Sequence, residues 1–161
     1  TRRSADLLSS KKIDLIVYDF DGVMTDNKVF VFEKGLEAVR CCRADGLGIN
    51  MIKKLGMDQI IISTESNPVV EVRAKKIDIP VIYNCENKLL ALELYCEQNN
   101  LDKARVLYVG NDINDLDVMN AVGIPVCPSD AHPSILKIAS IALETKGGDG
   151  VVRELAEKFE Y

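Results

Sequence analysis

Three carboxylates follow the first apolar segment of the chain in the stretch Tyr18-Asp19-Phe20-Asp21-Gly22-Val23-Met24-Thr25-Asp26. The segment that leads into it, Ile13–Tyr18, is apolar apart from Asp14 and contains the β-branched residues Ile13, Ile16 and Val17, which is typical of a buried strand. Carboxylates this close together repel one another unless a cation or a proton holds them. Because ligands bind at the carboxyl ends of strands in open α/β sheets, we expect a site for a hard divalent cation here.

The rest of the chain alternates short apolar segments with longer segments of helical period. This pattern predicts an α/β fold, a Rossmann-like parallel sheet flanked by helices. The expected strands are Ile13–Tyr18, Gln59–Ser63, Val81–Tyr83, Arg105–Val109, Pro125–Cys127 and Ile138–Leu143. The expected helices lie at Gly46–Leu55, Pro68–Lys76, Lys88–Asn99, Ile113–Val122, Pro133–Lys137 and Gly150–Phe159.

One segment, Val29–Cys42, interrupts this alternation. Four apolar residues, Val29-Phe30-Val31-Phe32, are followed by the turn signal Glu33-Lys34-Gly35 and by the extended run Ala38–Cys42. This order predicts a β-hairpin that projects beside the first strand.

The length and composition limit the class of protein. The 161 residues suit one domain, which we expect at residues 13–161 after a polar tail or linker at residues 1–12. The chain begins without Met, as an excised piece of a longer protein does. No basic stripe accompanies the net charge of −5, and no apolar run approaches the roughly 18 residues of a membrane span. We therefore expect neither nucleic acid nor a membrane as a partner.

The five cysteines point to a reducing compartment. Their number is odd and they form no C-x-x-C pair. We expect reduced structural thiols in a cytoplasmic protein.

A second polar cluster, Tyr108-Val109-Gly110-Asn111-Asp112-Ile113-Asn114-Asp115, also follows a short apolar strand. Between the two clusters, Ser63-Thr64 closes another strand and Lys88 opens a helix. Hydroxyl donors and one fixed positive charge are the groups that a transferring phosphoryl group requires. The sequence therefore predicts a phosphate site beside the cation site.

In this order the motifs D-x-D-G-x-x-T, Ser/Thr after a strand, Lys, and G-N-D-x-x-D resemble the four ordered motifs of the haloacid dehalogenase superfamily. The resemblance implies that Asp19 is a nucleophile that forms an aspartyl phosphate and that Asp21 is the general acid and base. It also implies phosphate binding by Ser63, Thr64 and Lys88.

The same resemblance implies a Mg²⁺ site formed by Asp19, the backbone carbonyl of Asp21 and the loop that ends at Asp115. Asn111 stands where the family usually has an acid. Either Asn111 supplies its amide oxygen or Asp112 replaces it, and Asp115 either contacts the metal or orients the loop. His132, before Pro133, suits a helix N-terminus and a structural or rim role.

The chain has no room for the cap domain that many members of this superfamily carry. About 36 residues separate Asp26 from Ser63 and about 24 separate Ser63 from Lys88, fewer than the roughly 50 of a domain.

Three segments are similar to the capless phosphatases of eight- and nine-carbon sugar acids: the hairpin, Asp130–Pro133 and Lys146–Glu154. That likeness implies a homotetramer in which a neighbour's surface covers the site. Similar domains are fused to cytidylyltransferases that activate sialic acids, so such an enzyme is a candidate partner.

The two residues after Ser63 bear on the choice of substrate. The phosphatases of 3-deoxy-octulosonate 8-phosphate usually have Gly-Arg there, whereas this chain has Thr64-Glu65. Glu65 is more similar to the nonulosonate 9-phosphate branch, and a carboxylate accepts hydrogen bonds from several sugar hydroxyls. Arg73 is the candidate for binding the carboxylate of the sugar acid.

Two other classes of function compete with the phosphatase. A signalling receiver module also uses an aspartyl phosphate, but its phosphorylated Asp normally follows an interior strand, whereas this D-x-D follows the first. A non-catalytic assembly domain of a cytidylyltransferase would be expected to lose the nucleophile or the general acid, and both are present here.

Overall fold

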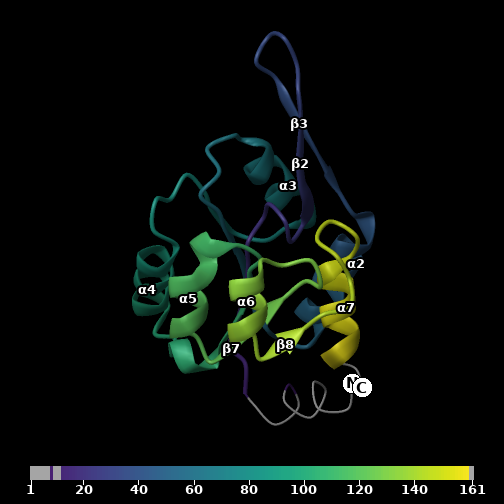
Figure 1. Ribbon diagram of the computed structural model, residues 1–161. Helices are drawn as coiled ribbons and strands as arrows, with labels where there is room; N and C mark the ends of the chain where they lie inside the picture. The colour runs from purple at the N-terminus through teal and green to yellow at the C-terminus, as the bar shows by residue number, and fades with distance from the viewer. Residues whose placement is uncertain (1–7, 9–11, 160–161) are drawn as a thin grey trace.

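Strand β1 (Leu15–Tyr18) lies inside a six-stranded parallel sheet in the computed structural model, which describes Leu8 and residues 12–159 (Figure 1). The strand order is β5-β4-β1-β6-β7-β8, so the chain winds outward from β1 first to one side and then to the other. The remaining strands are β4 (Asp58–Ile62), β5 (Val81–Ile82), β6 (Val106–Val109), β7 (Ile124–Cys127) and β8 (Ile141–Ala142). The predicted Rossmann-like parallel sheet is confirmed.

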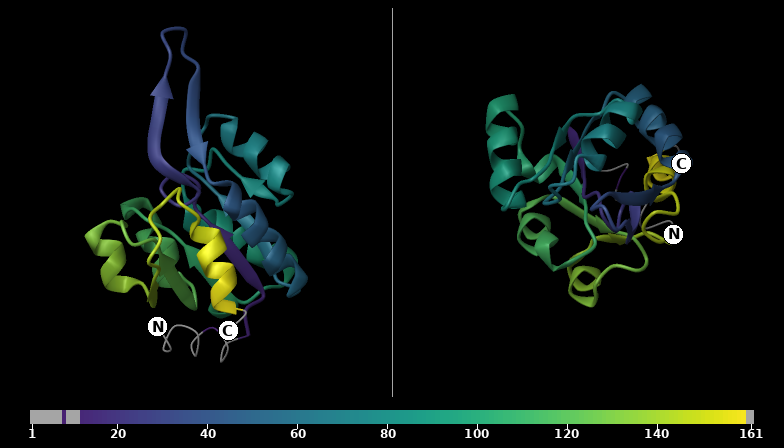
Figure 2. Two further views of the ribbon diagram at one scale, coloured as in Figure 1. Left: turned by 90° about the vertical axis from the view of Figure 1, so that its right-hand side faces the viewer. Right: turned by 90° about the horizontal axis from the view of Figure 1, so that it is seen from above.

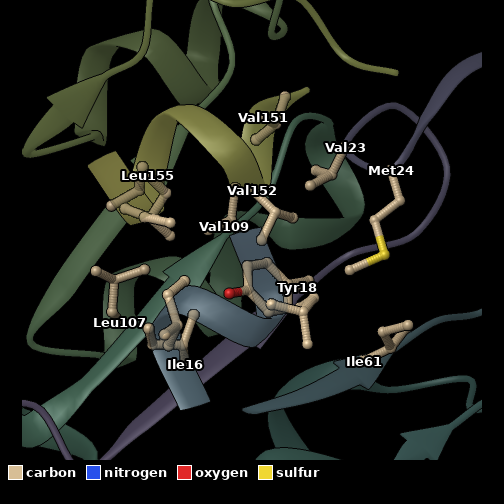
Figure 3. Packing of buried hydrophobic residues seen from close by; sticks show 14 of the residues in the cluster. Ile16, Tyr18, Val23, Met24, Ile61, Leu107, Val109, Val151, Val152 and Leu155 are labelled. Atoms are coloured by element: carbon tan, nitrogen blue, oxygen red, sulfur yellow. The ribbon is translucent and has the colours of Figure 1, made fainter. Parts of the chain in front are cut away.

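Helices cover both faces of this sheet. Successive side chains of β1 point to opposite faces, so each face carries apolar residues that must be buried. Ile16 and Tyr18 pack on one side (Figure 3). Leu15 and Val17 pack on the other, and all four side chains are fully buried. The first side is covered by α2 (Arg43–Lys54), α3 (Val69–Ile77) and α7 (Val151–Phe159). The second is covered by α4 (Lys88–Asn99), α5 (Leu116–Ala121) and α6 (Pro133–Ile138).

The elements differ from the sequence prediction mainly at their ends. Helix α2 starts at Arg43 rather than Gly46, so that Gly46 lies inside the helix together with Gly48. A Cβ at Gly48 would lie 2.7 Å from the carbonyl oxygen of Val152, so the close contact with α7 explains this glycine. The helix predicted at Ile113–Val122 is divided into a 3₁₀ turn, η2 (Ile113–Asp115), and α5. Another 3₁₀ turn, η1 (Lys103–Arg105), precedes β6.

The predicted hairpin is formed by β2 (Thr25–Val31) and β3 (Glu37–Cys41) and projects away from the main sheet (Figure 2). Its outer part is apolar and exposed: the exposed fractions are 68% for Phe30, 68% for Val31 and 70% for Leu36. The segment after the hairpin forms α2 and β4, and the segment from Ser63 to Lys88 forms α3 and β5. Both segments belong to the sheet and its helices, as expected for a capless fold.

Three other expectations concern the chain as a whole. The tail predicted at residues 1–12 lies outside the described residues except for Leu8 and Lys12. All five cysteines are free thiols. In the described part of the chain, no helix is both long and apolar enough to cross a membrane. The division into a tail and one domain stays a prediction.

Candidate active site

The two carboxylates after β1 lie where the strand order reverses, between β4 and β6. Asp19 continues the strand, since its N–H donates to the carbonyl of Val109 at 2.9 Å. The chain then turns at Gly22, whose φ of +87° favours glycine. A Cβ at Gly22 would lie 1.9 Å from the side-chain amide of Asn111. The D-x-D-G stretch and the Asn111 loop therefore pack directly against each other.

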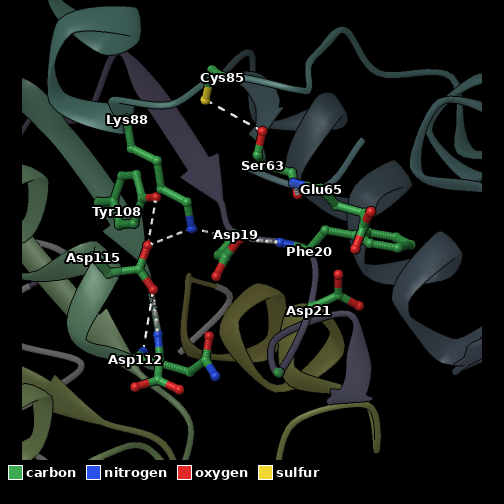
Figure 4. Close-up of polar contacts among 12 residues, drawn as sticks. Asp19, Phe20, Asp21, Ser63, Glu65, Cys85, Lys88, Tyr108, Asp112 and Asp115 are labelled. Atoms are coloured by element: carbon green, nitrogen blue, oxygen red, sulfur yellow. Dashed lines mark hydrogen bonds and ion pairs between the residues drawn. The ribbon is translucent and has the colours of Figure 1, made fainter. Parts of the chain in front are cut away.

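Lys88 is the buried cation of the site and is only 3% exposed. Its Nζ lies 2.7 Å from Asp19 Oδ1 and 2.8 Å from Asp115 Oδ1 (Figure 4). Burial opposes the charge on Lys88, but the two carboxylates outweigh it and raise the pKa of the ammonium group. The pKa of Asp19 is raised to about 7, mainly by burial and also by the Asp115 carboxylate, while Lys88 opposes the shift. Lys88, which the sequence singled out at the start of a helix, contacts the candidate nucleophile Asp19.

Asp115 is fully buried and holds the second loop together. Its Oδ1 accepts hydrogen bonds from Lys88 and from the hydroxyl of Tyr108 at 2.9 Å. Its Oδ2 accepts from the N–H groups of Asn111 at 2.9 Å and Asp112 at 3.3 Å. The Asp112 carboxylate instead caps η2, where it accepts from the N–H of Ile113 at 2.7 Å.

Asn111, rather than Asp112, faces the nucleophile. With its amide nitrogen turned inward, Asn111 donates to Asp19 Oδ2 at 3.1 Å and to the carbonyl oxygen of Asp21 at 2.9 Å. With its amide oxygen turned inward, three oxygens converge on one point, which is the donor set that Mg²⁺ prefers. Among the described residues, no group of three His, Cys, Asp or Glu side chains forms an alternative metal site. The residues therefore fit Mg²⁺ through one carboxylate, one amide and one backbone carbonyl.

Thr25 holds Asp21 in place, a role that sequence reasoning did not assign to it. Its hydroxyl is fully buried and donates to Asp21 Oδ1 at 3.0 Å, while accepting from the N–H of Gly22 at 3.3 Å and of Asn27 at 3.1 Å. Burial raises the pKa of Asp21, and the hydrogen bond from Thr25 opposes this shift. The only available signal was the Thr at the end of D-x-D-G-x-x-T.

These residues open onto a cavity of about 350 Å³. Its lining includes Asp19, Asp21 and Asn111, and also Thr64, Glu65 and Asn67. The Glu65 carboxylate accepts from the N–H of Asn67 at 2.8 Å. The predicted phosphate and sugar residues Thr64 and Glu65 therefore share one cavity with the candidate catalytic carboxylates.

Ser63 is 2% exposed and lies at the end of β4. Its hydroxyl oxygen accepts from the N–H of Glu65 at 3.1 Å. The hydroxyl proton makes no hydrogen bond within the described part of the chain and remains available to a ligand oxygen.

Arg73 is not among the residues that line this cavity, and its role as the ligand of the substrate carboxylate stays a prediction. Its guanidinium donates to the carbonyl of Cys42 at 2.9 Å and lines a separate cavity between α2 and α3 with Arg43 and Lys76. Sequence spacing placed Arg73 one helical span after the site, but spacing alone does not show which face of α3 it occupies. His132 caps α6, as expected, and its N–H donates to the Asn111 carbonyl at 2.8 Å.

Comparisons with known proteins agree with this geometry. A family model described as haloacid dehalogenase-like hydrolase matches residues 51–155. The 3-deoxy-D-manno-octulosonate 8-phosphate phosphatase KdsC of Escherichia coli K12 is 32% identical over 156 residues, which are 96% of this chain and 83% of the relative.

Solved structures show the same fold. A candidate HAD family hydrolase from Streptomyces avermitilis MA-4680 has a TM-score of 0.89 and 45% identity, covering 91% of this chain and 84% of that one. Another solved structure is the 3-deoxy-D-manno-octulosonate 8-phosphate phosphatase of Moraxella catarrhalis, in complex with magnesium, phosphate and KDO. It has a TM-score of 0.91 and 26% identity, covering 99% of this chain and 91% of that one. From the family match and the E. coli relative, this chain belongs to the haloacid dehalogenase-like hydrolases.

Proposed function

We propose that this chain is a Mg²⁺-dependent phosphatase that hydrolyses a sugar-acid phosphate through an aspartyl phosphate. The observation that carries the proposal is the contact set of Asp19, with Lys88 on one carboxylate oxygen and Asn111 beside the other. Mg²⁺ is the cofactor, held by Asp19, the carbonyl of Asp21 and Asn111. When bound, it neutralises negative charge on the phosphoryl oxygens.

In the first step, a carboxylate oxygen of Asp19 attacks phosphorus. The new O–P bond forms as the bond between phosphorus and the sugar oxygen breaks, and Asp21 donates its proton to the departing alkoxide. In this proposal Lys88 and the hydroxyl of Ser63 bind phosphoryl oxygens, together with Thr64. The contact of Lys88 with Asp19, the free hydroxyl proton of Ser63 and the place of Thr64 in the cavity lining support these roles. Burial favours this step, because it raises the pKa of Asp21 and so retains the proton that the leaving group takes.

In the second step, Asp21 accepts a proton from water as that water attacks the aspartyl phosphate. The O–P bond to Asp19 breaks, and inorganic phosphate leaves with Asp19 restored as a carboxylate. Thr25 keeps Asp21 oriented through both steps. Asp115 orients the loop and Lys88 rather than binding the metal, because both its oxygens already accept hydrogen bonds.

The covalent mechanism is tested by Asp19→Asn. We expect at least about 10³-fold loss of phosphate release with the fold retained, because an amide is a poor nucleophile. Asp117→Asn, the same change at an exposed position of α5, is the matched control. Acid-quenched wild-type enzyme should carry the mass of one phosphoryl group on Asp19. Wild-type turnover in Asp19→Asn would contradict the mechanism.

For the substrate we propose a nonulosonate 9-phosphate, such as the 9-phosphate of KDN or of N-acetylneuraminate. Glu65 supports this choice, since its carboxylate lines the cavity and can accept hydrogen bonds from sugar hydroxyls. The alternative is 3-deoxy-D-manno-octulosonate 8-phosphate, which the names of the E. coli and M. catarrhalis relatives favour. Phosphate release from both substrates, with and without chelator, distinguishes the two, and preference for the octulosonate contradicts the role given to Glu65.

We also propose a homotetramer in the cytoplasm, with the hairpins packed between copies. The exposed apolar residues of β2 and of the turn that follows it support this assembly, because contiguous apolar patches mark interfaces. Any contact of Arg73 with substrate then requires a neighbouring copy. Association with a cytidylyltransferase remains a prediction, as does the non-catalytic assembly role, which absence of phosphate release from both substrates would favour.

A further inference from the structure

The cavity over Asp19 is strongly acidic. Five of the side chains that line it are carboxylates: Asp19, Asp21, Glu37, Glu65 and Asp112. The substrate proposed above is itself an anion at both ends, with a phosphate and a carboxylate. Lys88 and the metal face the phosphate end, so the carboxylate end must find its own positive charge or be repelled.

Among the described residues that line the cavity, Lys28 alone carries a positive charge. Lys28 lies near the base of the hairpin, on β2, and is exposed. Within the described part of the chain, no ion pair or side-chain hydrogen bond holds its ammonium group. This lysine is therefore available to an anion that enters the cavity.

The backbone presents Lys28 through a bulge. Thr25 pairs with Cys41 and Val29 pairs with Val39, so residues 26–28 of β2 stand opposite the single residue Arg40 of β3. A bulge redirects the side chains of a strand, and bulges are frequent next to active sites. Here the bulge includes Asn27 with a φ of +61°.

This bulge is fixed to the catalytic loop and to the rest of the hairpin. The N–H of Lys28 donates to Asp26 Oδ1 at 3.2 Å, and the N–H of Asn27 donates to the Thr25 hydroxyl that holds Asp21. Arg40 lies 3.2 Å from Asp26 Oδ2. The position of Lys28 relative to Asp21 is thus set by short-range contacts rather than by the free length of the hairpin.

We propose that Lys28 binds the carboxylate of the sugar acid and selects phosphate esters that carry a carboxylate over esters that lack one. The proposal rests on the phosphatase function proposed above. Lys28 supplies a positive charge inside the cavity, which Arg73 of the same chain does not line. Lys28 takes no part in phosphoryl transfer, so its effect is confined to substrates with a carboxylate.

The test compares substrates with and without a carboxylate in the same variants. Lys28→Met keeps the length of the side chain and removes its charge, Lys28→Arg restores the charge, and Lys137→Met is the matched control on the exposed surface of α6. The substrates are a nonulosonate 9-phosphate, 3-deoxy-octulosonate 8-phosphate, glucose 6-phosphate and p-nitrophenyl phosphate. Measurement of phosphate release gives kcat and KM for each variant with each substrate.

We expect Lys28→Met to lower kcat/KM for the carboxylated substrates by about 10-fold to 100-fold, mainly through KM, as the loss of a charge-assisted hydrogen bond does. The two substrates without a carboxylate should change less than about twofold, and Lys28→Arg should recover most of the loss. Equal losses on all four substrates, or no loss on any, would overturn the proposal.

Two further outcomes separate this inference from the proposed function. Loss of the carboxylate preference in Arg73→Ala, with Lys28→Met unchanged, would overturn the role of Lys28 and assign the cation to a neighbouring copy. A wild-type enzyme that hydrolyses glucose 6-phosphate as efficiently as both sugar-acid phosphates would instead contradict the proposed substrate class, whatever the variants do.

Discussion

Asn111 is the residue whose chemistry most affects the metal site. Its side chain reaches Asp19 Oδ2 and the carbonyl of Asp21, where an acid would add a formal negative charge. We expect Asn111→Asp to lower the Mg²⁺ concentration for half-maximal activity by about 3-fold to 10-fold, because carboxylates bind Mg²⁺ more strongly than amides. A magnesium titration of phosphate release measures this.

Asp112→Asn is the control for that prediction. The Asp112 carboxylate accepts the N–H of Ile113 in η2, so an amide should keep the cap and leave the magnesium titration nearly unchanged. If Asp112→Asn weakened Mg²⁺ binding and Asn111→Asp had no effect, the roles of the two residues would be reversed.

Thr25 gives a second prediction at the scale of single residues. Thr25→Val removes the hydroxyl that donates to Asp21, and we expect kcat to fall about tenfold, since one hydrogen bond contributes about 1–1.5 kcal/mol. Thr25→Ser keeps the hydroxyl and should retain most of the activity. The pH profile of kcat should shift in Thr25→Val alone; an unchanged kcat and profile would remove the positioning role.

Sequence reasoning located the candidate site well where residues follow strands. Asp19 and Asp21 could be placed because parallel strands end at the same edge, and Lys88 because it opens a helix facing that edge. For Arg73 the spacing did not show which face of α3 it occupies; it lines another cavity, and its role stays a prediction. Lys28 was missed because a bulge, not a strand period, directs it.

At the scale of elements, α2 and α7 are joined by a buried carboxylate. Asp45 of α2 is 1% exposed and accepts from the N–H of Val152 at 3.0 Å, so it satisfies an N–H group at the start of α7. Its Oδ2 has no hydrogen-bond partner among the described residues. Burial raises the pKa of Asp45 to about 6, although the hydrogen bonds from α7 oppose this shift.

This pKa makes stability depend on pH in a definite direction. An unfolded aspartate has a pKa of about 3.9, so the native state holds the Asp45 proton more tightly. The stabilisation is present at low pH and is lost as the pH rises from about 4 to about 6, by up to about 3 kcal/mol. In Asp45→Asn this contribution should be absent, as urea unfolding at pH 4.5 and 7.5 can measure. The control Asp117→Asn should follow wild type; the same pH dependence in Asp45→Asn and wild type would contradict the assignment.

The order of elements was more predictable than their ends. Each predicted strand and helix exists, because periodicity reports which residues are buried. The start of α2 was misjudged by three residues: the helix begins at Arg43, and Gly46 lies in its interior, where glycine normally weakens a helix. The close contact of Gly48 with the backbone of α7 was not predicted either. That contact joins residues distant in sequence, so no local pattern reveals it.

At the scale of the whole molecule, the hairpin presents apolar residues that the described part of its own chain does not cover. Phe30 and Leu36 are 68% and 70% exposed, so replacing them does not disturb the core of the chain. We expect Phe30→Asp combined with Leu36→Asp to keep the fold by circular dichroism but to sediment as a smaller species, because buried charges oppose an apolar interface.

The open cavity links this assembly to activity. If a neighbouring copy covers the site, the dissociated variant should lose activity on the sugar-acid phosphate by about tenfold or more and retain more of it on p-nitrophenyl phosphate, which needs fewer contacts. Leu136→Ser, a comparable change at an exposed apolar position of α6, should alter neither sedimentation nor activity. Full activity in a monomeric variant would show that the site works without a partner, and unchanged sedimentation would show that the hairpin is not the interface.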